Sequence, residues 1–325
     1  MREVSQDLVS INAKSGLSVG IIPKIISVHG AAANFAWEEF FSGQIRNPNT
    51  RKAYLTAVRQ FLSWIEKSEI ELPSITPGLI GMYFDQHPGS APTKKLHMSA
   101  IRGLFDTLVL RHVIVLNPAL SVRTEKYSAA EGKTPDLTTQ QVRKLLASIN
   151  LASQIDYRDH AIISTLIFTA ARVGAIARLQ VKDFVDEGHR YTLNFVEKRG
   201  KHRSIPVRHE LGDSISKYLE TVFLGQKREG SLFRSAIGKS GRLSERAISA
   251  IDICRMLKRR LDSAGLPTKF SPHSFRSCAA TDLLTQGVPL DEVQYLLSHA
   301  DARVTRLYDR RQKQVTRNIV ERISV

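Results

Sequence analysis

The sequence predicts a mainly α-helical protein with a small antiparallel β-sheet, an α+β fold divided into two domains. Helical apolar stripes recur along most of the 325 residues, whereas strand-like alternation is confined to one short region. A chain of this length can bury the cores of two ordinary domains. Residues 122–135 are polar and lack apolar periodicity, so this stretch is expected to be the linker between the domains.

The first domain is expected at residues 33–121, after a tail of weak periodicity at 1–32. A helix is predicted from Ala33. The segment Asn47-Pro48-Asn49-Thr50 then supplies turn and N-cap chemistry for a second helix. The apolar residues of that second helix recur at helical steps: Tyr54, Val58, Phe61, Leu62 and Ile65.

Two more helices complete this domain, one around Leu79 to Phe84 and one from Thr93 to about His112. The short connections between all four helices indicate a small all-helical domain. Basic side chains lie on the other faces of the last helix. Lys94, Lys95 and Arg102 among them are candidates for contacts with DNA.

The second domain is expected at residues 136–325 and is again mostly helical. Its first helix has Thr138 or Thr139 as a plausible N-cap. Residues 191–196 and 202–207 alternate in the manner of strands around a short basic segment. This pattern predicts a β-hairpin with a basic turn.

Net charge and cysteine content indicate which kinds of partner and site to expect. The formal net charge of +16 and the pI near 10.0 favour polyanions such as DNA or RNA, although a protein can also be basic without such a partner. The two cysteines, Cys254 and Cys278, stand in unrelated contexts, which argues against a disulfide framework or a zinc site. We expect Cys278 to pack as a small buried residue. We see no apolar run long enough to span a membrane and no signal peptide.

The most informative residues lie near the end of the chain. His273 and Arg276 are three residues apart, so on a helix they share one face. His299 and Tyr308 follow at a spacing that leaves one helix and begins the next. A guanidinium matches the oxygens of a phosphate, and a tyrosine hydroxyl can form an ester with phosphorus. The four residues therefore indicate phosphoryl transfer on nucleic acid.

Two cationic residues earlier in the chain can be added to these four. Arg172 follows an apolar helix, and Lys198 lies in the turn of the predicted hairpin. With these two, the set resembles the tyrosine recombinase (phage integrase) family, with a catalytic domain like those of the Xer and Cre recombinases. The resemblance covers roughly residues 135–315. It extends to the stretches 283–287 and 293–299, which are similar to the family's sequence between its second arginine and its tyrosine.

The resemblance implies a site-specific recombinase or integrase. Such an enzyme cleaves and rejoins DNA strands through a 3′-phosphotyrosyl intermediate, for integration, excision or resolution of DNA. Tyr308 would be the nucleophile. Arg172 and Arg276 would clamp the two non-bridging oxygens of the scissile phosphate.

The remaining roles follow from the same resemblance. His273 would hydrogen-bond the phosphate and help to manage the tyrosine proton. Lys198 would protonate the departing 5′-oxygen, with Lys201 as the alternative if the turn has another register. His299 would donate to a phosphate oxygen and pack against Tyr308. The family's chemistry needs no metal ion and no other cofactor.

The resemblance also implies partners. The domain at 33–121 is compatible with the family's core-binding (SAM-like) domain, and Lys201 and Arg203 are added as candidates for DNA contacts. The expected target is double-stranded DNA with inverted repeats, in the cytoplasm and at the nucleoid. Val315, Ile319 and Ile323 recur at steps of four on a short polar helix at the end of the chain. In the family such a helix links copies into dimers and tetramers; it could instead fold back on its own domain.

One departure from the family pattern concerns the support of Arg172, and two alternative functions are open independently of it. Three residues after its first arginine the family usually has an acidic residue, whereas this chain has Ala175; Asp183 could replace it, or could simply cap a turn. One alternative function is a type IB topoisomerase that nicks and reseals DNA. Another is a DNA-binding regulator that has kept the fold and lost catalysis.

Overall fold

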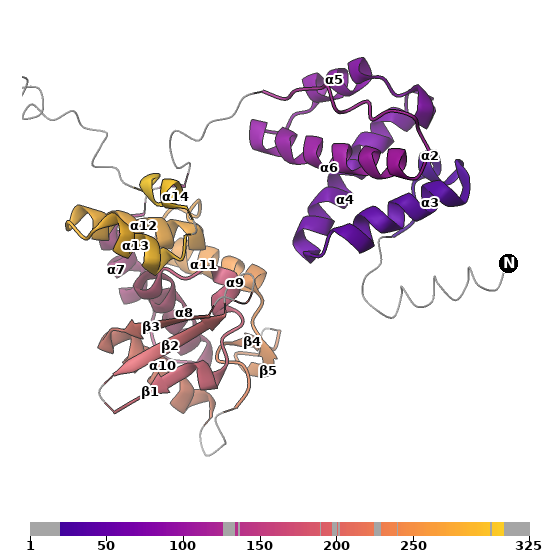
Figure 1. Ribbon diagram of the computed structural model, residues 1–325. Helices are drawn as coiled ribbons and strands as arrows, with labels where there is room; N and C mark the ends of the chain where they lie inside the picture. Colours follow the sequence, from indigo (N-terminus) through magenta and orange to yellow (C-terminus); the bar gives the residue numbers. More distant parts are fainter. Residues whose placement is uncertain are drawn as a thin grey trace, which may run out of the picture. The chain divides into compact units, whose positions relative to one another are not determined.

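The computed structural model describes residues 20–125, 134–135, 137–188, 190–196, 200, 202–223, 229–238, 240–299 and 301–308. The chain divides into two compact units, residues 1–128 and 129–325, called here the N-terminal unit and the C-terminal unit (Figure 1). Both units are mainly helical, and within the described ranges every strand belongs to the C-terminal unit. The α+β fold class predicted from the sequence is confirmed.

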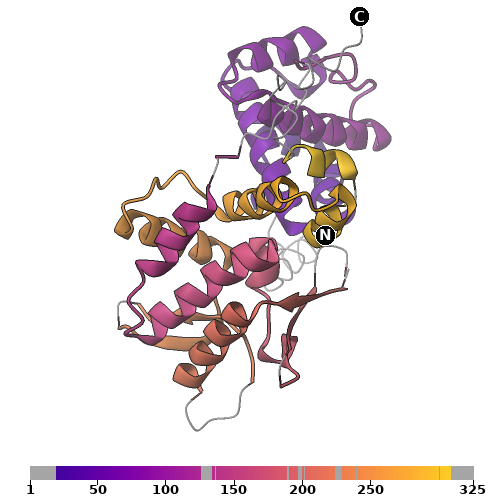
Figure 2. The same ribbon diagram turned by 90° about the vertical axis from the view of Figure 1, so that its left-hand side faces the viewer.

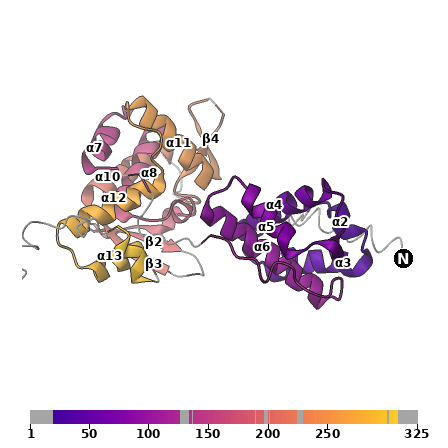
Figure 3. The ribbon, with the colours of Figure 1, turned by 90° about the horizontal axis from the view of Figure 1, so that it is seen from above.

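The N-terminal unit is a set of helices around one apolar core. Its elements are α2 (Lys24–Ser27), α3 (Gly30–Glu38), the π-helical η1 (Glu39–Gln44), α4 (Pro48–Glu66), the 3-10 turn η2 (Leu72–Ser74), α5 (Pro77–Gln86) and α6 (Ala91–Leu110). Helix α4 packs on α6, and both run next to α5 when the ribbon is seen from above (Figure 3). Trp37, Phe41, Phe61 and Phe105 are fully buried in this core.

Sequence signals decide where the helices of this unit begin. The side chain of Asn47 accepts hydrogen bonds from the backbone N–H groups of Asn49 and Thr50, at 2.9 and 3.3 Å. The cap predicted for α4 is thereby confirmed, because these bonds satisfy N–H groups that have no partner within the helix.

Helical structure begins at Lys24, earlier than the Ala33 that the sequence predicts. The reason is tertiary packing. Ile25 and Ile26 are buried in the core, and the backbone N–H of Ile25 donates to the Glu66 side chain on α4 at 3.1 Å. A segment this short has too few residues for its apolar periodicity to be read from the sequence.

The C-terminal unit is built around α8, which packs on α7, α10, α11 and α12. The helices of the unit are α7 (Thr139–Ala147), α8 (Gln154–Thr169), α9 (Val173–Ile176), the 3-10 turn η3 (Val181–Asp183), α10 (His209–Val222), α11 (Ala250–Ser263), α12 (Pro272–Thr285), α13 (Leu290–Leu297) and α14 (Ala302–Arg306). Helix α7 begins where predicted, since Thr138 forms a capping box with Gln141.

The strands form two small antiparallel sheets. The first has the order β1 (Phe184–Asp186), β2 (Tyr191–Val196) and β3 (His202–Val207), and the second pairs β4 (Arg234–Ala236) with β5 (Leu243–Ala247). The predicted hairpin is confirmed as β2 and β3, which pair Leu193 with Ile205, both buried. The sequence did not predict β1, β4 or β5, since strands of three to five residues give little periodicity.

A buried group of charges fixes α8 to α11. Asp159 is 1% exposed and accepts hydrogen bonds from Arg158 at 2.6 Å and from Arg260 at 2.9 Å. Arg260 also donates to Asp156 at 2.6 Å. Charges this deep are tolerated because each carboxylate is paired and hydrogen-bonded. The network holds the helix that leads into Arg172.

Helices α12, α13 and α14 lie next to one another at one end of the C-terminal unit (Figures 1 and 2). Among the helices that the structure describes, none has the length and apolarity to cross a membrane. Over the same described ranges, no three metal-ligating side chains come together in a cluster.

Candidate active site

The start of α12 presents the first two residues of the site. Ser271 caps this helix through a reciprocal box with Ser274, and Pro272 occupies the first turn. His273 therefore lies in the first turn and keeps an exposed surface, while Arg276, one turn further on, is 3% exposed. The prediction that these two residues share one helix is confirmed.

Arg276 is held between the ends of two other helices. Its guanidinium donates from Nη1 to the carbonyl of Ala170 and from Nη2 to the carbonyl of Leu297. Ala170 and Ser298 both adopt left-handed backbone, with φ of 48° and 49°, and so end α8 and α13. The last carbonyls of a helix have no partner within it and carry partial negative charge, which suits a guanidinium.

Arg172 lies beside this arrangement. It follows the end of α8, is partly buried, and donates from Nη2 to the carbonyl of Ser298 at 3.4 Å. Ala175, at the position where the family usually has an acidic residue, is 4% exposed and belongs to the apolar core. Asp183 accepts from the backbone N–H of Gln180 at 2.8 Å and caps η3. A backbone carbonyl thus helps to anchor Arg172.

Tyr308 completes the cluster from the end of the described chain. Its hydroxyl lies 3.2 Å from Nε2 of His273, and its ring stacks on His299 with centroids 5.8 Å apart. Thr305 contacts Nδ1 of His299 at 2.9 Å, and Thr281 on α12 donates to the carbonyl of Tyr308 at 3.2 Å. Tyr308 is 6% exposed.

The local electrostatics keep both histidines neutral and the phenol protonated. Burial, with the charges of Arg276 and Arg172, lowers the pKa of His273 below its usual range. The same causes lower the pKa of His299 to about 4. Burial raises the pKa of Tyr308, while Arg276 and Arg172 act in the opposite direction. The phenol therefore needs a base to lose its proton, and the neutral His273 ring is within reach of it.

The candidates on the hairpin divide into two groups. Lys198 and Lys201 lie outside the described residues. Arg203 on β3 is 6% exposed, donates from Nη1 to the carbonyl of Leu296, and covers the ring of Phe195 with its guanidinium carbon 5.4 Å from the centroid. Its guanidinium is therefore used inside the protein.

The candidates in the N-terminal unit also differ from one another. Lys95 is exposed on α6, and Lys94 lies 3.5 Å from Glu125. Arg102 donates to the carbonyls of Ala119 and Val122 and so holds the chain that follows α6. The structure gives Arg102 a packing role. Val315, Ile319 and Ile323 of the predicted terminal helix lie outside the described residues.

Sequence reasoning did not find the groups that support the site. Thr281, Thr305 and the carbonyls of residues 297 and 298 hold the candidate residues Tyr308, His299, Arg276 and Arg172 through hydrogen bonds. The threonines have no distinctive spacing. A backbone carbonyl is present at every residue, so nothing in a sequence can mark it.

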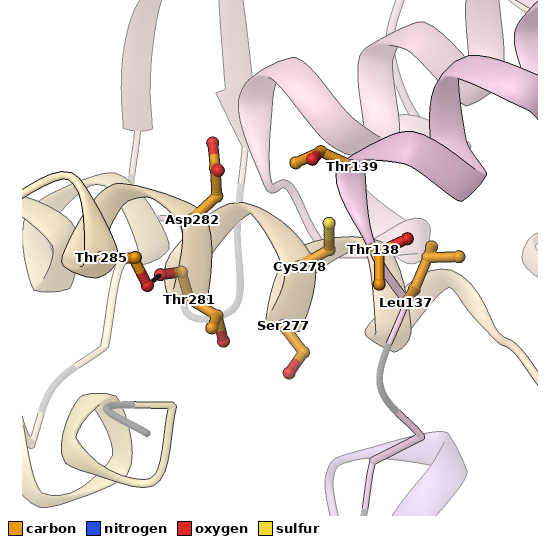
Figure 4. Close-up of a pocket in the computed structure, with 8 residues that line it drawn as sticks. All are labelled: Leu137, Thr138, Thr139, Ser277, Cys278, Thr281, Asp282 and Thr285. Atoms are coloured by element: carbon orange, nitrogen blue, oxygen red, sulfur yellow. Dashed lines mark hydrogen bonds between the residues drawn. The ribbon is translucent and has the colours of Figure 1, made fainter. Parts of the chain in front are cut away.

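A cavity of about 300 Å³ adjoins the site between the start of α7 and α12. In Figure 4 Cys278 points from α12 toward the start of α7. Cys278 is 6% exposed, which confirms that it packs as a small buried residue. Burial, with Asp282 nearby, raises the pKa of its thiol to about 11, so the thiol stays protonated and unreactive.

Comparisons with known sequences point to one family. The model of the phage integrase family matches residues 135–315. The tyrosine recombinase XerC of Halalkalibacterium halodurans is 30% identical over 278 residues, which are 81% of this chain and 86% of the relative. The tyrosine recombinase XerD of Ralstonia nicotianae is 28% identical over 266 residues, 80% of this chain and 83% of the relative.

Solved structures share the fold. A lambda integrase (75–356) dimer bound to a COC′ core site superposes with a TM-score of 0.65 at 17% identity, over 87% of this chain and 96% of that one. A lambda integrase tetramer bound to a Holliday junction gives 0.63 at 16% identity, over 97% and 88%. The XerH site-specific recombinase bound to palindromic difH substrate gives 0.62 at 22% identity, over 84% and 77%.

Proposed function

Because the chain belongs to the phage integrase family and is a tyrosine recombinase, which cleaves and rejoins DNA, we propose that Tyr308 is its nucleophile. The other proposed active-site residues are two arginines, two histidines and a lysine: Arg172, Arg276, His273, His299 and Lys198. One observation carries the proposal. The Tyr308 hydroxyl lies 3.2 Å from Nε2 of His273, and the charges of both arginines act on the phenol.

In the proposed reaction the Tyr308 oxygen attacks the scissile phosphorus, and the bond from phosphorus to the 5′-oxygen breaks. The products are a 3′-phosphotyrosyl ester and a strand that ends in a 5′-hydroxyl. His273 accepts the phenolic proton, and Lys198 gives a proton to the departing oxygen, so the step balances. The lowered pKa of His273 supports its role, since a neutral ring can accept a proton at pH 7.

The two arginines supply the charge that the transition state requires. Arg172 and Arg276 donate to the non-bridging oxygens, where negative charge develops as the tyrosine attacks. Their contacts with helix-end carbonyls support this role, because side chains already oriented lose little entropy when the phosphate arrives. His299 adds a hydrogen bond to a phosphate oxygen. Because guanidiniums neutralise the phosphate, we propose that cleavage needs no metal ion.

The proposed partner is double-stranded DNA that carries inverted repeats, so that the enzyme acts at the nucleoid. The net charge of +16 supports a DNA partner, and Lys94 and Lys95 on α6 are the proposed phosphate contacts of the N-terminal unit. Four candidate arginines bond to backbone carbonyls, but Arg276 and Arg172 also act on the phenol of Tyr308, so those two stay the proposed phosphate contacts. We propose a packing role, and no DNA contact, for the other two, Arg102 and Arg203.

We also propose that copies associate on DNA through the C-terminal segment containing Val315, Ile319 and Ile323. A chain truncated from Thr316 onward keeps Tyr308 and every proposed phosphate contact. It is expected to bind a half-site and to lose synapsis and strand exchange. Gel shifts with half-site and paired-site DNA, together with a recombination assay, measure the two steps. Undiminished recombination by the truncated chain contradicts this role.

Covalent capture tests the central proposal. The probe is a DNA library with randomised inverted repeats and a nick next to the cleavage position. The short strand beyond the nick diffuses away after cleavage, so the strand cannot be rejoined and the adduct accumulates. In EDTA we expect a protein–DNA band on a denaturing gel, with the nucleotide on the peptide that contains Tyr308. An adduct on another residue contradicts the assignment, as does cleavage that requires Mg²⁺.

A further inference from the structure

Three arginines from three elements bind consecutive backbone carbonyls at the end of α13. We call these carbonyls, of residues 296–298, the α13 carbonyl edge. Arg203 on β3 donates to the first, Arg276 on α12 to the second, and Arg172, which follows α8, to the third at 3.4 Å. The edge therefore joins the small sheet to both proposed phosphate-binding arginines.

The α13 carbonyl edge is suited to hold cations. The last carbonyls of a helix have no partner within it, and the helix dipole adds partial negative charge at this end. The left-handed Ser298, with φ of 49°, turns the chain sharply and ends the helix there. Like charges repel, so three guanidiniums around one helix end need such an acceptor.

Arg203 differs from the other two arginines in its surroundings. It pairs with Phe195 in the register of β2 and β3, and its guanidinium carbon lies 5.4 Å from the centroid of that ring. The side chain is 6% exposed, similar to Arg276 at 3%, whereas Arg172 is only partly buried. A side chain packed this way on a strand is held by the sheet, which makes it an anchor for α13.

We propose that Arg203 is a positioning residue for the reaction. It fixes the α13 carbonyl edge against the sheet, and the edge in turn sets where Arg276 and Arg172 meet the phosphate. The inference rests on the proposed function, since it takes those two arginines as the phosphate clamp. If Arg203 is lost, the α13 carbonyl edge keeps its hydrogen bonds with Arg276 and Arg172 and loses the one that joins it to the sheet. A displacement of about 1 Å at such a clamp costs about 10²-fold in rate.

The test compares two substrates in single-turnover adduct formation. One has the natural scissile phosphate. The other has a methylphosphonate there, in which a methyl group replaces one non-bridging oxygen and removes the charge that the clamp neutralises. Arg203→Met keeps an apolar stem on Phe195 and removes every donor. We expect adduct formation on the phosphate to fall about 10²-fold with DNA affinity unchanged. On the methylphosphonate we expect a smaller loss of rate than on the phosphate. Arg172→Ala, which removes one of the proposed clamp residues directly, should show the same pattern and serves as the reference.

Two further variants make the result decisive. Arg203→Lys keeps one cationic donor and is expected to recover part of the rate; it replaces Arg203→Met if that variant does not fold. Arg208→Met is the matched control, because Arg208 follows the same strand but is exposed and pairs with Glu210 at 2.7 Å. It should behave as the wild type does.

Three outcomes overturn the inference: an unchanged rate in folded Arg203→Met, an equal loss on both substrates, or a loss that only follows weaker DNA binding. Failure of the proposed function is seen separately. In that case the wild type forms no adduct through Tyr308 on either substrate.

Discussion

Each unit contains a tyrosine grouped with two histidines, and in both groups the tyrosine hydroxyl lies 3.2 Å from a ring nitrogen of one histidine. In the N-terminal unit the Tyr83 hydroxyl lies 3.2 Å from Nδ1 of His97, and His87 packs edge-on against His97 with ring centroids 4.5 Å apart. In the C-terminal unit the Tyr308 hydroxyl lies 3.2 Å from Nε2 of His273. The two tyrosines are equally buried, at 5% and 6% exposed.

The surroundings of the two groups differ. Tyr83 packs against aromatic rings, including those of Phe61 and Trp64, and burial alone raises its pKa to about 12. Around Tyr308 the charges of Arg276 and Arg172 oppose the effect of burial. A hydrogen bond between a tyrosine and a histidine is thus found in the N-terminal core as well, and does not by itself indicate catalysis. Two converging guanidiniums make the second group suited to phosphoryl transfer.

The histidines differ in access. His97 is 5% exposed, whereas His273 keeps an exposed surface at the start of α12. Because Tyr83 and His97 also line a cavity, of about 840 Å³, the clearer difference between the two groups is the pair of arginines that acts on Tyr308. Four predictions test this contrast, from the largest expected effect to the smallest.

The largest effect is expected from removing one hydroxyl in each group. Tyr308→Phe should abolish the covalent adduct with nicked DNA, since no oxygen remains to attack phosphorus. Tyr83→Phe should form the adduct at the rate of the wild type. Both proteins should bind DNA, as measured by gel shift. A normal yield of adduct from Tyr308→Phe contradicts the assignment of the nucleophile.

Removing one arginine should have the next largest effect. Arg276→Ala or Arg172→Ala loses a charged donor to the transition state, which costs about 3–4 kcal/mol or more in the rate of cleavage. DNA affinity should fall far less, because many cations share the phosphate contacts. Arg111, paired with Glu39 at 2.7 Å in the N-terminal unit, is the control site. Equal losses in cleavage and binding would mean that the two arginines only hold DNA.

The sequence predicted those features of the C-terminal unit that depend on residues close together in the chain. Residue spacing alone indicated that His273 and Arg276 share a helix, and alternation indicated the hairpin of β2 and β3. The charge of a residue is visible in a sequence, but its burial is not. Arg102 and Arg203 were therefore expected to contact DNA, although both guanidiniums bond to backbone carbonyls of the protein.

Tertiary contacts account for what the sequence left out. The α13 carbonyl edge has no signal in side-chain identity. The tyrosine group of the N-terminal unit forms because Tyr83 on α5 meets His97 on α6, and no local pattern marks that meeting. Tyr308 could be predicted as the nucleophile because it follows the arginines, the lysine and the histidines in the family's order. Tyr83 has no such series of residues before it.

The third prediction concerns pH. Burial and the two arginines lower the pKa of His273, so its ring stays neutral to lower pH than an ordinary histidine with a pKa of about 6.5. Because the neutral ring accepts the phenolic proton, the rate of adduct formation should hold through about pH 6.5 and decline only below it. Rates are measured in single turnover, with circular dichroism to show that the protein is folded at each pH. An inflection at or above about pH 6.5 contradicts the prediction.

The smallest expected effect is on stability, where Tyr83→Phe should cost more than Tyr308→Phe, the opposite of their effects on adduct formation. Tyr83→Phe removes the partner of Nδ1 in His97, and both residues are buried. A buried group left without a hydrogen bond costs about 1–3 kcal/mol in the free energy of unfolding. Tyr308→Phe should cost less, because water can replace the hydroxyl at the exposed His273. Stability should therefore depend on the tyrosine that catalysis does not use.

The two units can be followed separately in the intact chain. Trp37 and Trp64 are the only tryptophans of the sequence, and both lie in the N-terminal unit. Tryptophan fluorescence in urea thus reports unfolding of that unit, and far-ultraviolet circular dichroism reports both. The fluorescence midpoint should fall for Tyr83→Phe, and the circular dichroism transition that fluorescence does not follow, that of the C-terminal unit, should shift less for Tyr308→Phe. If each variant lowers the midpoint of its own unit equally, or neither does, the two tyrosine–histidine pairs do not differ in the way that their surroundings indicate.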